Sequence, residues 1–376
     1  MEIAVNARFL SQETCGPQRF AGNLCRELKK LRPDTLFLAP PEIRNRQLAR
    51  ELGIRIIGES NYQRYRKLRL PAGPLWEQYA LTAWLREHGH PPLFNPANQA
   101  PLFYDDNYIV IHDLAFHLYP EFFTRRFAFY YNLTIPRLAQ RARHIFTVSR
   151  FSKETMVAHL KLAPEKISLV GNAVDQVFAA PPESPPPLPT DVRPPFVLCV
   201  GSLEPRKNLE MLLAAFQLLD RDNLQLVVAG SANPKVFRRI PDLVRDDERI
   251  IFTGHLDDNA LAALYRRAEI FVYPSLFEGF GLPPLEAQAC GCPVLVAEAG
   301  ALPEVFANSA LFCDPDDPED IAGRMARLLD DAGLRQQLRE AGRKNAARFS
   351  WRESARIVTE TIIEQEKLRK TTCQQT

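Results

Sequence analysis

The sequence lacks the features that mark several specialised classes of protein. It has no run of about 18 uncharged apolar residues, so we expect no segment to span a bilayer. The opening stretch MEIAVNARFL reads as a strand rather than as a signal peptide, so we expect no secretory leader. The formal net charge is only +2, which argues against a protein dedicated to nucleic-acid binding.

The cysteines likewise show no pattern of a disulfide scaffold or a metal site. There are seven in 376 residues. Cys199 lies in the apolar run FVLCV, which predicts a core position. Cys290 and Cys292 flank a single glycine, and no second cluster supplies the about four ligands of a zinc site. We therefore expect reduced thiols and a cytoplasmic protein.

The length and one proline-rich segment predict two domains. A chain of 376 residues exceeds the size of one comfortable core. Residues 179–195 are so rich in proline that they can neither pair as an inner strand nor continue a helix, which predicts a semi-rigid linker. This divides the chain into an N-terminal domain, 1–178, and a C-terminal domain, 196–350, followed by a helical tail, 351–376.

Both halves alternate short apolar runs with stretches of helical spacing. Runs such as YIVIHD, FVLCVGS and EIFVYPS have the length of strands, and RFAGNLCRELKKL and NLEMLLAAFQLL have the spacing of helices. Buried strands that alternate with helices predict parallel sheets covered on both faces. The expected fold class is α/β, with two Rossmann-like domains and a cleft between them, and ligands are expected at the carboxyl ends of the strands.

Two basic residues follow the first strand of the second half. In GSLEPRKNLEMLL, Arg206 and Lys207 precede Asn208, which we expect to cap the next helix. A helix N-terminus attracts anions, so two cations beside it predict a diphosphate site. A pair of solvated surface charges is an equally good interpretation of the spacing alone.

The stretch FEGFGLPPLE places two carboxylates around a glycine turn. Gly279 and Gly281 allow backbone N–H groups to approach a ligand. Glu286 is expected in the first turn of the following helix, where it could simply complement the helix dipole. Glu278 lies on the turn itself, where a carboxylate has no obvious structural duty and can accept hydrogen bonds from sugar hydroxyls.

Other candidates are weaker on sequence alone. His112 follows a strand in YIVIHD, although a lone histidine is more often structural. Gly16 lies in a loop between a strand and a helix. Asp314 and Asp316 form a D-x-D pair of the kind that can hold Mg²⁺, but the neighbouring prolines and helix favour a loop and a cap.

These segments together resemble the retaining glycosyltransferases of family 4, which have the GT-B fold. The resemblance rests on VGSLEPRKNLEMLL, on IFTGHLDDNALAALYRRAEIFVYPSLFEGFGLPPLEAQACGCPV and on LPEV, which together cover most of the second half in order. The first half matches more loosely, through TCGPQRFAGNL, LWEQ, IHDLAF, TVSRFSK and GNAVD. The resemblance implies that the tail 351–376 crosses back to the N-terminal domain, and that this domain binds the acceptor.

The resemblance assigns roles to individual residues. Arg206 and Lys207 would bind the donor diphosphate. Glu286 would bind the ribose hydroxyls, and Glu278 would contact the transferred sugar. His112 would lie near the reacting centre, and Gly16 where acceptor and diphosphate meet. Phe280, Gly281 and Leu282 would offer backbone N–H groups, and Glu304 would lie near the nucleotide.

The sequence departs from the family pattern at two positions. Ser202 stands where many relatives carry a basic residue, so one phosphate contact is missing or comes from elsewhere. Asn172-Ala173 replaces the usual Asn-Gly, and a position that needed positive φ would disfavour alanine.

The resemblance implies transfer with retained anomeric configuration, no covalent nucleophile, and neither a metal nor another cofactor. The donor would be a nucleotide-diphosphate sugar, with GDP-mannose favoured, and the acceptor a saccharide or lipid-linked saccharide in lipopolysaccharide, exopolysaccharide or capsule assembly. The basic and aromatic stretch NYQRYRKLRL could rest on the inner face of the plasma membrane or could be a solvated helix face.

Three other functions stay open at this point. One is a nucleotide-sugar epimerase of the same fold, against which the ordered Arg-Lys and paired-Glu motifs weigh. The second is a dinucleotide-dependent oxidoreductase, which the absence of a G-x-G-x-x-G after either opening strand disfavours. The third is a non-catalytic protein that binds sugar nucleotides.

Overall fold

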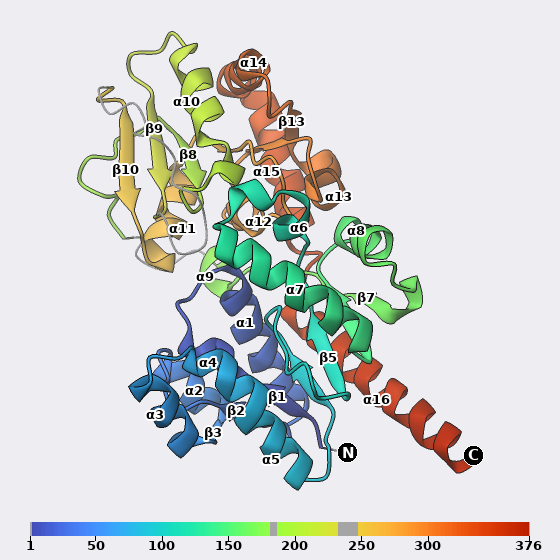
Figure 1. Cartoon of the computed structure of the whole chain (residues 1–376). Coiled ribbons are helices and arrows are strands. Elements are labelled where there is room, and N and C mark those ends of the chain that lie inside the picture. The colour runs from blue at the N-terminus through green and yellow to red at the C-terminus, as the bar shows by residue number, and fades with distance from the viewer. Residues whose placement is uncertain (1, 181–185, 232–246, 376) are drawn as a thin grey trace. The chain divides into compact units, whose positions relative to one another are not determined.

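The computed structural model describes residues 2–180, 186–231 and 247–375, and the chain divides into two compact units (Figure 1). Unit 1 comprises Met1–Leu114, Tyr130–Asn172 and Trp351–Thr376, and unit 2 comprises Ala115–Phe129 and Ala173–Ser350. Residues 115–129 and 173–178, which the sequence places in the first domain, thus belong to unit 2. One boundary falls inside a helix, where composition gives no signal.

Unit 1 is built on a parallel sheet whose strand order is β3-β2-β1-β4-β5-β6-β7. Ala4 and Val5 of β1 pair with Leu36 and Phe37 of β2 on one side and with Leu93 and Phe94 of β4 on the other. The middle strands are buried on both faces, as their apolar runs predict. The strands are β1 (Ala4–Asn6), β2 (Leu36–Ala39), β3 (Arg55–Ile56), β4 (Leu93–Asn95), β5 (Asn107–Val110), β6 (His144–Thr147) and β7 (Ile167–Leu169).

Helices cover this sheet, and the C-terminal helix is one of them. Helix α16 packs against α1 within unit 1, and the two are seen side by side in Figure 1. Tyr108 of β5 donates a hydrogen bond of 2.9 Å to Glu366 of α16. The helices are α1 (Gly16–Leu31), α2 (Arg46–Leu52), α3 (Glu59–Lys67), α4 (Ala72–Leu75), α5 (Thr82–Glu87), α7 (Arg125–Arg141, in part), α8 (Arg150–Leu160) and α16 (Trp351–Gln375), with short turns η1 (Ala7–Ser11) and η4 (Pro164–Lys166) and the π-helical η2 (Trp76–Leu81).

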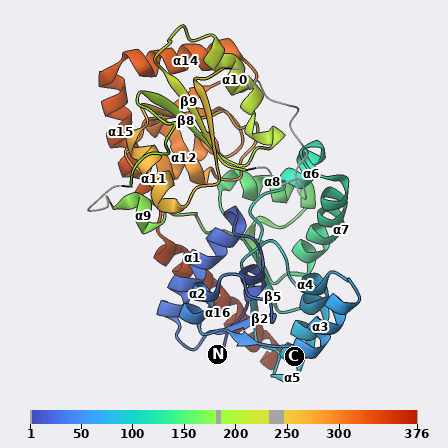
Figure 2. The same cartoon turned by 90° about the vertical axis from the view of Figure 1, so that its left-hand side faces the viewer.

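Unit 2 repeats the architecture with a parallel sheet in the order β10-β9-β8-β11-β12-β13. Its core joins β8 and β9 to the apolar faces of α10 and α14, which lie together in Figure 2. Its strands are β8 (Phe196–Val200), β9 (Gln225–Ala229), β10 (Ile250–Gly254), β11 (Ile270–Tyr273), β12 (Val294–Ala297) and β13 (Leu311–Cys313). Its helices are α6 (Ala115–Leu118), η3 (Pro120–Phe122), α9 (Gln176–Ala179), η5 (Pro205–Lys207), α10 (Leu209–Gln217), α11 (Asp258–Arg267), α12 (Leu282–Ala289), α13 (Leu302–Phe306), η6 (Ala307–Ser309), α14 (Pro318–Asp330) and α15 (Ala332–Ala346).

The expected α/β class with two parallel sheets is therefore confirmed. Cys199 is buried in the unit 2 core, and the cysteines whose side chains are described are free thiols. Ala173 is not among the residues with positive φ, so the Asn172-Ala173 turn needs no glycine. Within the predicted linker, residues 181–185 lie outside the described part of the chain, and residues 186–195 form neither helix nor strand.

Candidate active site

The candidate residues of unit 2 follow two neighbouring strands at its sheet centre. The chain leaves β8 toward β9 on one side and leaves β11 toward β12 on the other, so the carboxyl ends of β8 and β11 flank the point where strand order reverses. Open α/β sheets bind ligands at such points. Turn η5 carries Arg206 and Lys207 after β8, and residues 275–281 follow β11.

Glu278 is the centre of this cluster. Its Oε1 accepts hydrogen bonds from Lys207 Nζ (2.7 Å), Ser275 Oγ (2.7 Å) and Tyr273 OH (3.0 Å). Its Oε2 lies 2.9 Å from Nη1 of Arg206. The side chain that the sequence assigned to a sugar is thus bound to both cations assigned to the diphosphate.

The surroundings of Glu278 fix its charge. Burial raises the pKa of this carboxyl, but the charges of Arg206 and Lys207 and hydrogen bonds from Lys207 and Ser275 outweigh burial and lower the pKa to about 2. The carboxylate is therefore ionised at neutral pH. It can accept hydrogen bonds from hydroxyls, but it cannot donate a proton to a leaving group.

A second carboxylate, which sequence reasoning missed, holds Arg206. Oε1 of Glu204 lies 2.6 Å from Nη2 of Arg206, and Nη1 of Arg206 donates to the carbonyl of Phe277 at 2.8 Å. Glu204 is fully buried, and its Oε2 has no hydrogen-bond partner among the described residues. The sequence signal is the spacing E-P-R-K, in which the acid comes two residues before the arginine it orients.

Asn208 does not cap α10 with its side chain, so that prediction is wrong. Its φ is 58°, and its side chain donates instead to the carbonyl of Pro315 at 2.6 Å. Asn208 links turn η5 to α10 in the left-handed conformation, and its side-chain amide makes no hydrogen bond to the first turn of α10. Ser202, which stands in place of a basic residue, lies half-buried just before this turn.

Gly281 sets the start of α12. Its φ is 94°, and a Cβ there would lie 2.6 Å from Cδ2 of Leu302, so both the conformation and the space require glycine. The helix begins at Leu282, directly after the buried Phe280. Glu286 consequently lies in the second turn rather than the first, where it is buried and accepts a hydrogen bond of 3.3 Å from Tyr265 OH.

The two candidates from the first half both belong to unit 1. His112 follows β5, and its Nε2 is buried without a hydrogen-bond partner among the described residues. Burial lowers the pKa of His112 to about 4, so the ring is neutral at pH 7. The ring of Phe20 meets it edge-on at 4.7 Å. Gly16 is the first residue of α1, where a Cβ would have no neighbour within 4 Å.

The aspartates of the D-x-D pair organise a loop. Asp314 Oδ1 accepts from the backbone N–H of Asp316 at 3.0 Å, and Asp320 Oδ2 accepts from that of Asp314 at 2.9 Å. Asp317 caps the N-terminus of α14. Among the described residues, no three His, Cys, Asp or Glu side chains are grouped so as to hold a metal ion.

Comparison with known protein families matches both halves of the chain. Residues 15–178 match the model of glycosyltransferase family 4, and residues 182–345 match that of glycosyl transferases group 1. The chain belongs to the glycosyltransferases described by these two models, family 4 and group 1. The resemblance to family 4 glycosyltransferases is thus confirmed, and so is the expectation that the chain is a transferase.

Among similar sequences, several carry the name mannosyltransferase. The chain is 33% identical over 233 residues to the serotype-specific mannosyltransferase WbdA of Escherichia coli, covering 59% of this chain and 29% of WbdA. It is 31% identical over 249 residues to the O-antigen chain mannosyltransferase B of Escherichia coli, covering 64% and 65% of the two chains. The match thus spans less than a third of WbdA and slightly less than two thirds of mannosyltransferase B.

Solved structures share the fold across the whole chain. Anabaena HepE, solved in complex with UDP and glucose, superposes with a TM-score of 0.70 at 16% identity, covering 97% of this chain and 100% of HepE. The lipopolysaccharide glycosyltransferase WaaG superposes with a TM-score of 0.67 at 14% identity, covering 96% and 99% of the two chains. The GT-B assignment follows. Within the described part of the chain, no helix combines the length and apolar character needed to cross a membrane.

Proposed function

We propose that this chain transfers a hexose from a nucleotide-diphosphate sugar, GDP-mannose by preference, to a saccharide or lipid-linked saccharide during cell-surface polysaccharide assembly, with retention of anomeric configuration. The observation that carries the proposal is the cluster in which the half-buried Arg206 and Lys207 bind the buried Glu278 carboxylate at the carboxyl ends of β8 and β11. The names of the mannosyltransferase relatives support the choice of sugar and of pathway class.

The cluster suits the charge changes of glycosyl transfer. As the anomeric C–O bond breaks, negative charge grows on the leaving phosphate and the sugar becomes oxocarbenium-like. Arg206 and Lys207, already desolvated and oriented, would stabilise that phosphate charge at little cost of reorganisation. Glu278 holds both cations before the donor binds and offers acceptor oxygens to the sugar hydroxyls.

Proton transfer in this scheme does not use Glu278. A carboxyl with a pKa of about 2 is a poor general acid at pH 7. The acceptor hydroxyl would instead pass its proton to the departing phosphate as the new glycosidic bond forms on the same face of the sugar. His112, neutral at pH 7, would serve as a hydrogen-bonding group for the sugar.

The reaction as proposed uses no metal. Two side-chain cations and the backbone N–H groups of Phe280, Gly281 and Leu282, which precede the two prolines of α12, would supply the positive charge that Mg²⁺ supplies at a D-x-D site. Full transfer in the presence of EDTA is the expected result, and loss of transfer that Mg²⁺ restores would overturn this part. The proposed location is cytoplasmic, at the inner face of the plasma membrane.

The test measures donor binding and transfer in matched variants. Thermal shifts with GDP-, UDP- and dTDP-sugars identify the donor, because a ligand at about 100 times its Kd stabilises by about 2.7 kcal/mol. We expect the best donor to lose most of its shift in Lys207→Ala but not in Arg221→Ala, which removes an exposed ion pair with Asp330 in the same unit.

Product analysis then separates transfer from the other functions. Radiolabelled mannose appearing on an acceptor extract supports the proposal. Equal thermal shifts in wild type and Lys207→Ala would contradict it, as would conversion of UDP-GlcNAc to its epimer without any transfer. Donor binding without turnover by either route would favour a non-catalytic binding protein.

A further inference from the structure

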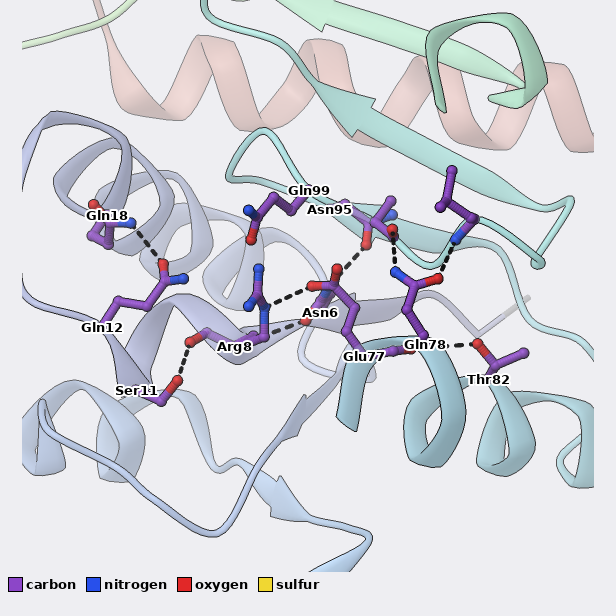
Figure 3. A network of polar contacts seen from close by, with 12 residues as sticks. Asn6, Arg8, Ser11, Gln12, Gln18, Glu77, Gln78, Thr82, Asn95 and Gln99 are labelled. Carbon is purple, nitrogen blue, oxygen red and sulfur yellow. Dashed lines mark hydrogen bonds and ion pairs between the residues drawn. The ribbon is translucent and has the colours of Figure 1, made fainter. Parts of the chain in front are cut away.

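Unit 1 has its own reversal of strand order, and a polar network lies there. The chain leaves β1 for β2 on one side and leaves β4 for β5 on the other, so the carboxyl ends of β1 and β4 are neighbours at the centre of the sheet. This is where an open α/β sheet binds its ligand. Figure 3 shows side chains from β1, η1, η2 and β4 converging at these ends.

Two asparagines at the strand ends form the base of the network. Asn6 donates through Nδ2 to Asn95 Oδ1 and to Glu77 Oε2, both at 3.0 Å. Asn95 in turn donates to Asn107 Oδ1 at 3.0 Å. All four side chains are buried. The network fixes the Glu77 carboxylate over the end of β1.

Arg8 completes the network but leaves much of its bonding capacity unused. Its Nε lies 2.7 Å from Glu77 Oε2, and the residue is only 6% exposed. A guanidinium has five N–H donors, four of them on the two terminal nitrogens. Neither terminal nitrogen of Arg8 donates a hydrogen bond to a described residue, and Oε1 of Glu77 accepts none from the same part of the chain. These atoms are not among the fully buried side-chain atoms that lack a partner in the described part of the chain, so they reach solvent and are available to a ligand.

The backbone opposite is shaped to leave room for the guanidinium. A Cβ at Gly73 of α4 would lie 3.3 Å from Nη1 of Arg8. The φ of Gly73 is not positive, so its backbone conformation does not require glycine. Glycine at this position therefore serves to leave space for the guanidinium of Arg8. On the other side, Figure 3 places Gln99 facing Arg8, and Gln99 Nε2 donates to Tyr131 OH at 3.2 Å.

The charge balance of the pair selects the class of ligand. Arg8 and Glu77 neutralise each other, so a phosphate or carboxylate placed on Arg8 would approach the Glu77 carboxylate as well. A hydroxyl can both accept from a guanidinium and donate to a carboxylate. The free donors of Arg8 and the free acceptor of Glu77 therefore complement the hydroxyls of an uncharged sugar.

We infer that Arg8 and Glu77 form a binding site in unit 1 for the hydroxyls of a neutral saccharide, the sugar end of the acceptor. This inference rests on the proposed transferase function for the role of the ligand, whereas the binding itself can be measured without any donor. Asn6, Asn95 and Gly73 are positioning residues, because they act through Arg8 and Glu77.

The test titrates the full chain with methyl α-mannopyranoside by ligand-detected NMR, with inorganic phosphate in a parallel arm. The decisive variant is Arg8→Gln/Glu77→Gln, which removes both charges together and leaves no lone buried ion. Its matched control is Arg26→Gln/Glu51→Gln, which removes an ion pair of 2.8 Å whose side chains are 40% and 38% exposed in the same unit. Gly73→Ala is a second variant that moves the guanidinium while keeping both charges.

We expect saturable binding of the mannoside to wild type and to the control, and affinity at least about tenfold lower in the double variant. Gly73→Ala should weaken binding in the same direction, and it decides the matter if the double variant does not fold. Equal affinity in all variants would overturn the inference. So would binding of phosphate in place of the mannoside, or no mannoside binding to wild type up to about 100 mM.

The donor measurements keep this inference separate from the proposed function. The thermal shift with the nucleotide sugar should be unchanged in the Arg8 and Glu77 variants, because these variants leave intact Arg206, Lys207 and Glu278, the proposed donor contacts in unit 2. A failed mannoside titration with intact transfer would refute the saccharide site alone. Mannoside binding without any transfer would refute the transferase proposal alone.

Discussion

Glu204 and Arg206 are two residues apart in the chain, and 2.6 Å separates Oε1 of the one from Nη2 of the other. The same guanidinium lies 2.9 Å from Glu278 through its other terminal nitrogen. Arg206 is thus held between two carboxylates. Of these, Glu204 is fully buried and has no access to a ligand, so it acts only by positioning the arginine.

Replacing Glu204 by glutamine should therefore weaken donor binding more than it slows turnover. The variant keeps the shape but removes the charge that orients Arg206, and support of this kind is worth about 10-fold or more. We expect donor KM to rise by about that factor with a smaller change in kcat. Steady-state kinetics provide the test, with the exposed Glu210→Gln as control, and an unchanged donor KM would contradict the positioning role.

The low pKa of Glu278 predicts a loss of stability in acid. The pKa falls from an ordinary 4.5 to about 2 on folding, so the stabilisation is complete above pH 4.5 and is lost as the pH falls toward 2. Relative to Glu278→Gln, wild type should lose about 2 kcal/mol of unfolding free energy between pH 5 and pH 3. Urea unfolding at both pH values measures this, and a difference that does not change with pH would refute it.

His112 should titrate far below neutrality. Its pKa of about 4 follows from burial, which disfavours the imidazolium. Folding stability is therefore unaffected by this ring above about pH 6.5 and falls as the pH drops toward 4, because only the unfolded state binds the proton in that range. Two-dimensional NMR of the imidazole C–H groups gives the value directly. Because His144 also has a pKa of about 4, the spectrum of His112→Gln assigns the signal. A midpoint between pH 6 and 7 would show that the ring is not desolvated.

Gly281 and Gly323 provide a matched pair of glycine-to-alanine substitutions in unit 2. At Gly281, the φ of 94° and the 2.6 Å approach of Leu302 should make alanine cost about 2 kcal/mol or more and disturb the start of α12. At Gly323, inside α14, a Cβ meets nothing within 4 Å, so alanine should stabilise by about 0.5–1 kcal/mol. Thermal denaturation of both variants tests the contrast, and equal effects would refute it.

The fold was largely predictable because buried parallel strands are continuous apolar runs. Strands β8 and β11 fall within the predicted runs. Strands β3 (Arg55–Ile56) and β4 (Leu93–Asn95) went unnoticed, since the first has two exposed residues and the second ends in a polar side chain. That polar end, Asn95, proves to be part of the unit 1 network.

The candidate site was predictable in its members but not in their pairing. Arg206, Lys207 and Glu278 could be found because polar residues after apolar strands are conspicuous. Their contact depends on β8 lying beside β11, which brings together residues 71 positions apart. Tyr273 and Ser275 were missed for the same reason, because nothing local marks them as partners of Glu278.

Helix α16 ties the end of the chain to its beginning. Ala355, Val358 and Ile362 of this helix are fully buried, and unit 1 contains both α16 and α1 although all of residues 173–350 intervene. A ribosome that makes the chain from its N-terminus therefore completes unit 2 before the last element of unit 1 exists. During synthesis, unit 1, which contains Arg8 and His112, therefore keeps part of its apolar surface exposed until α16 has been made.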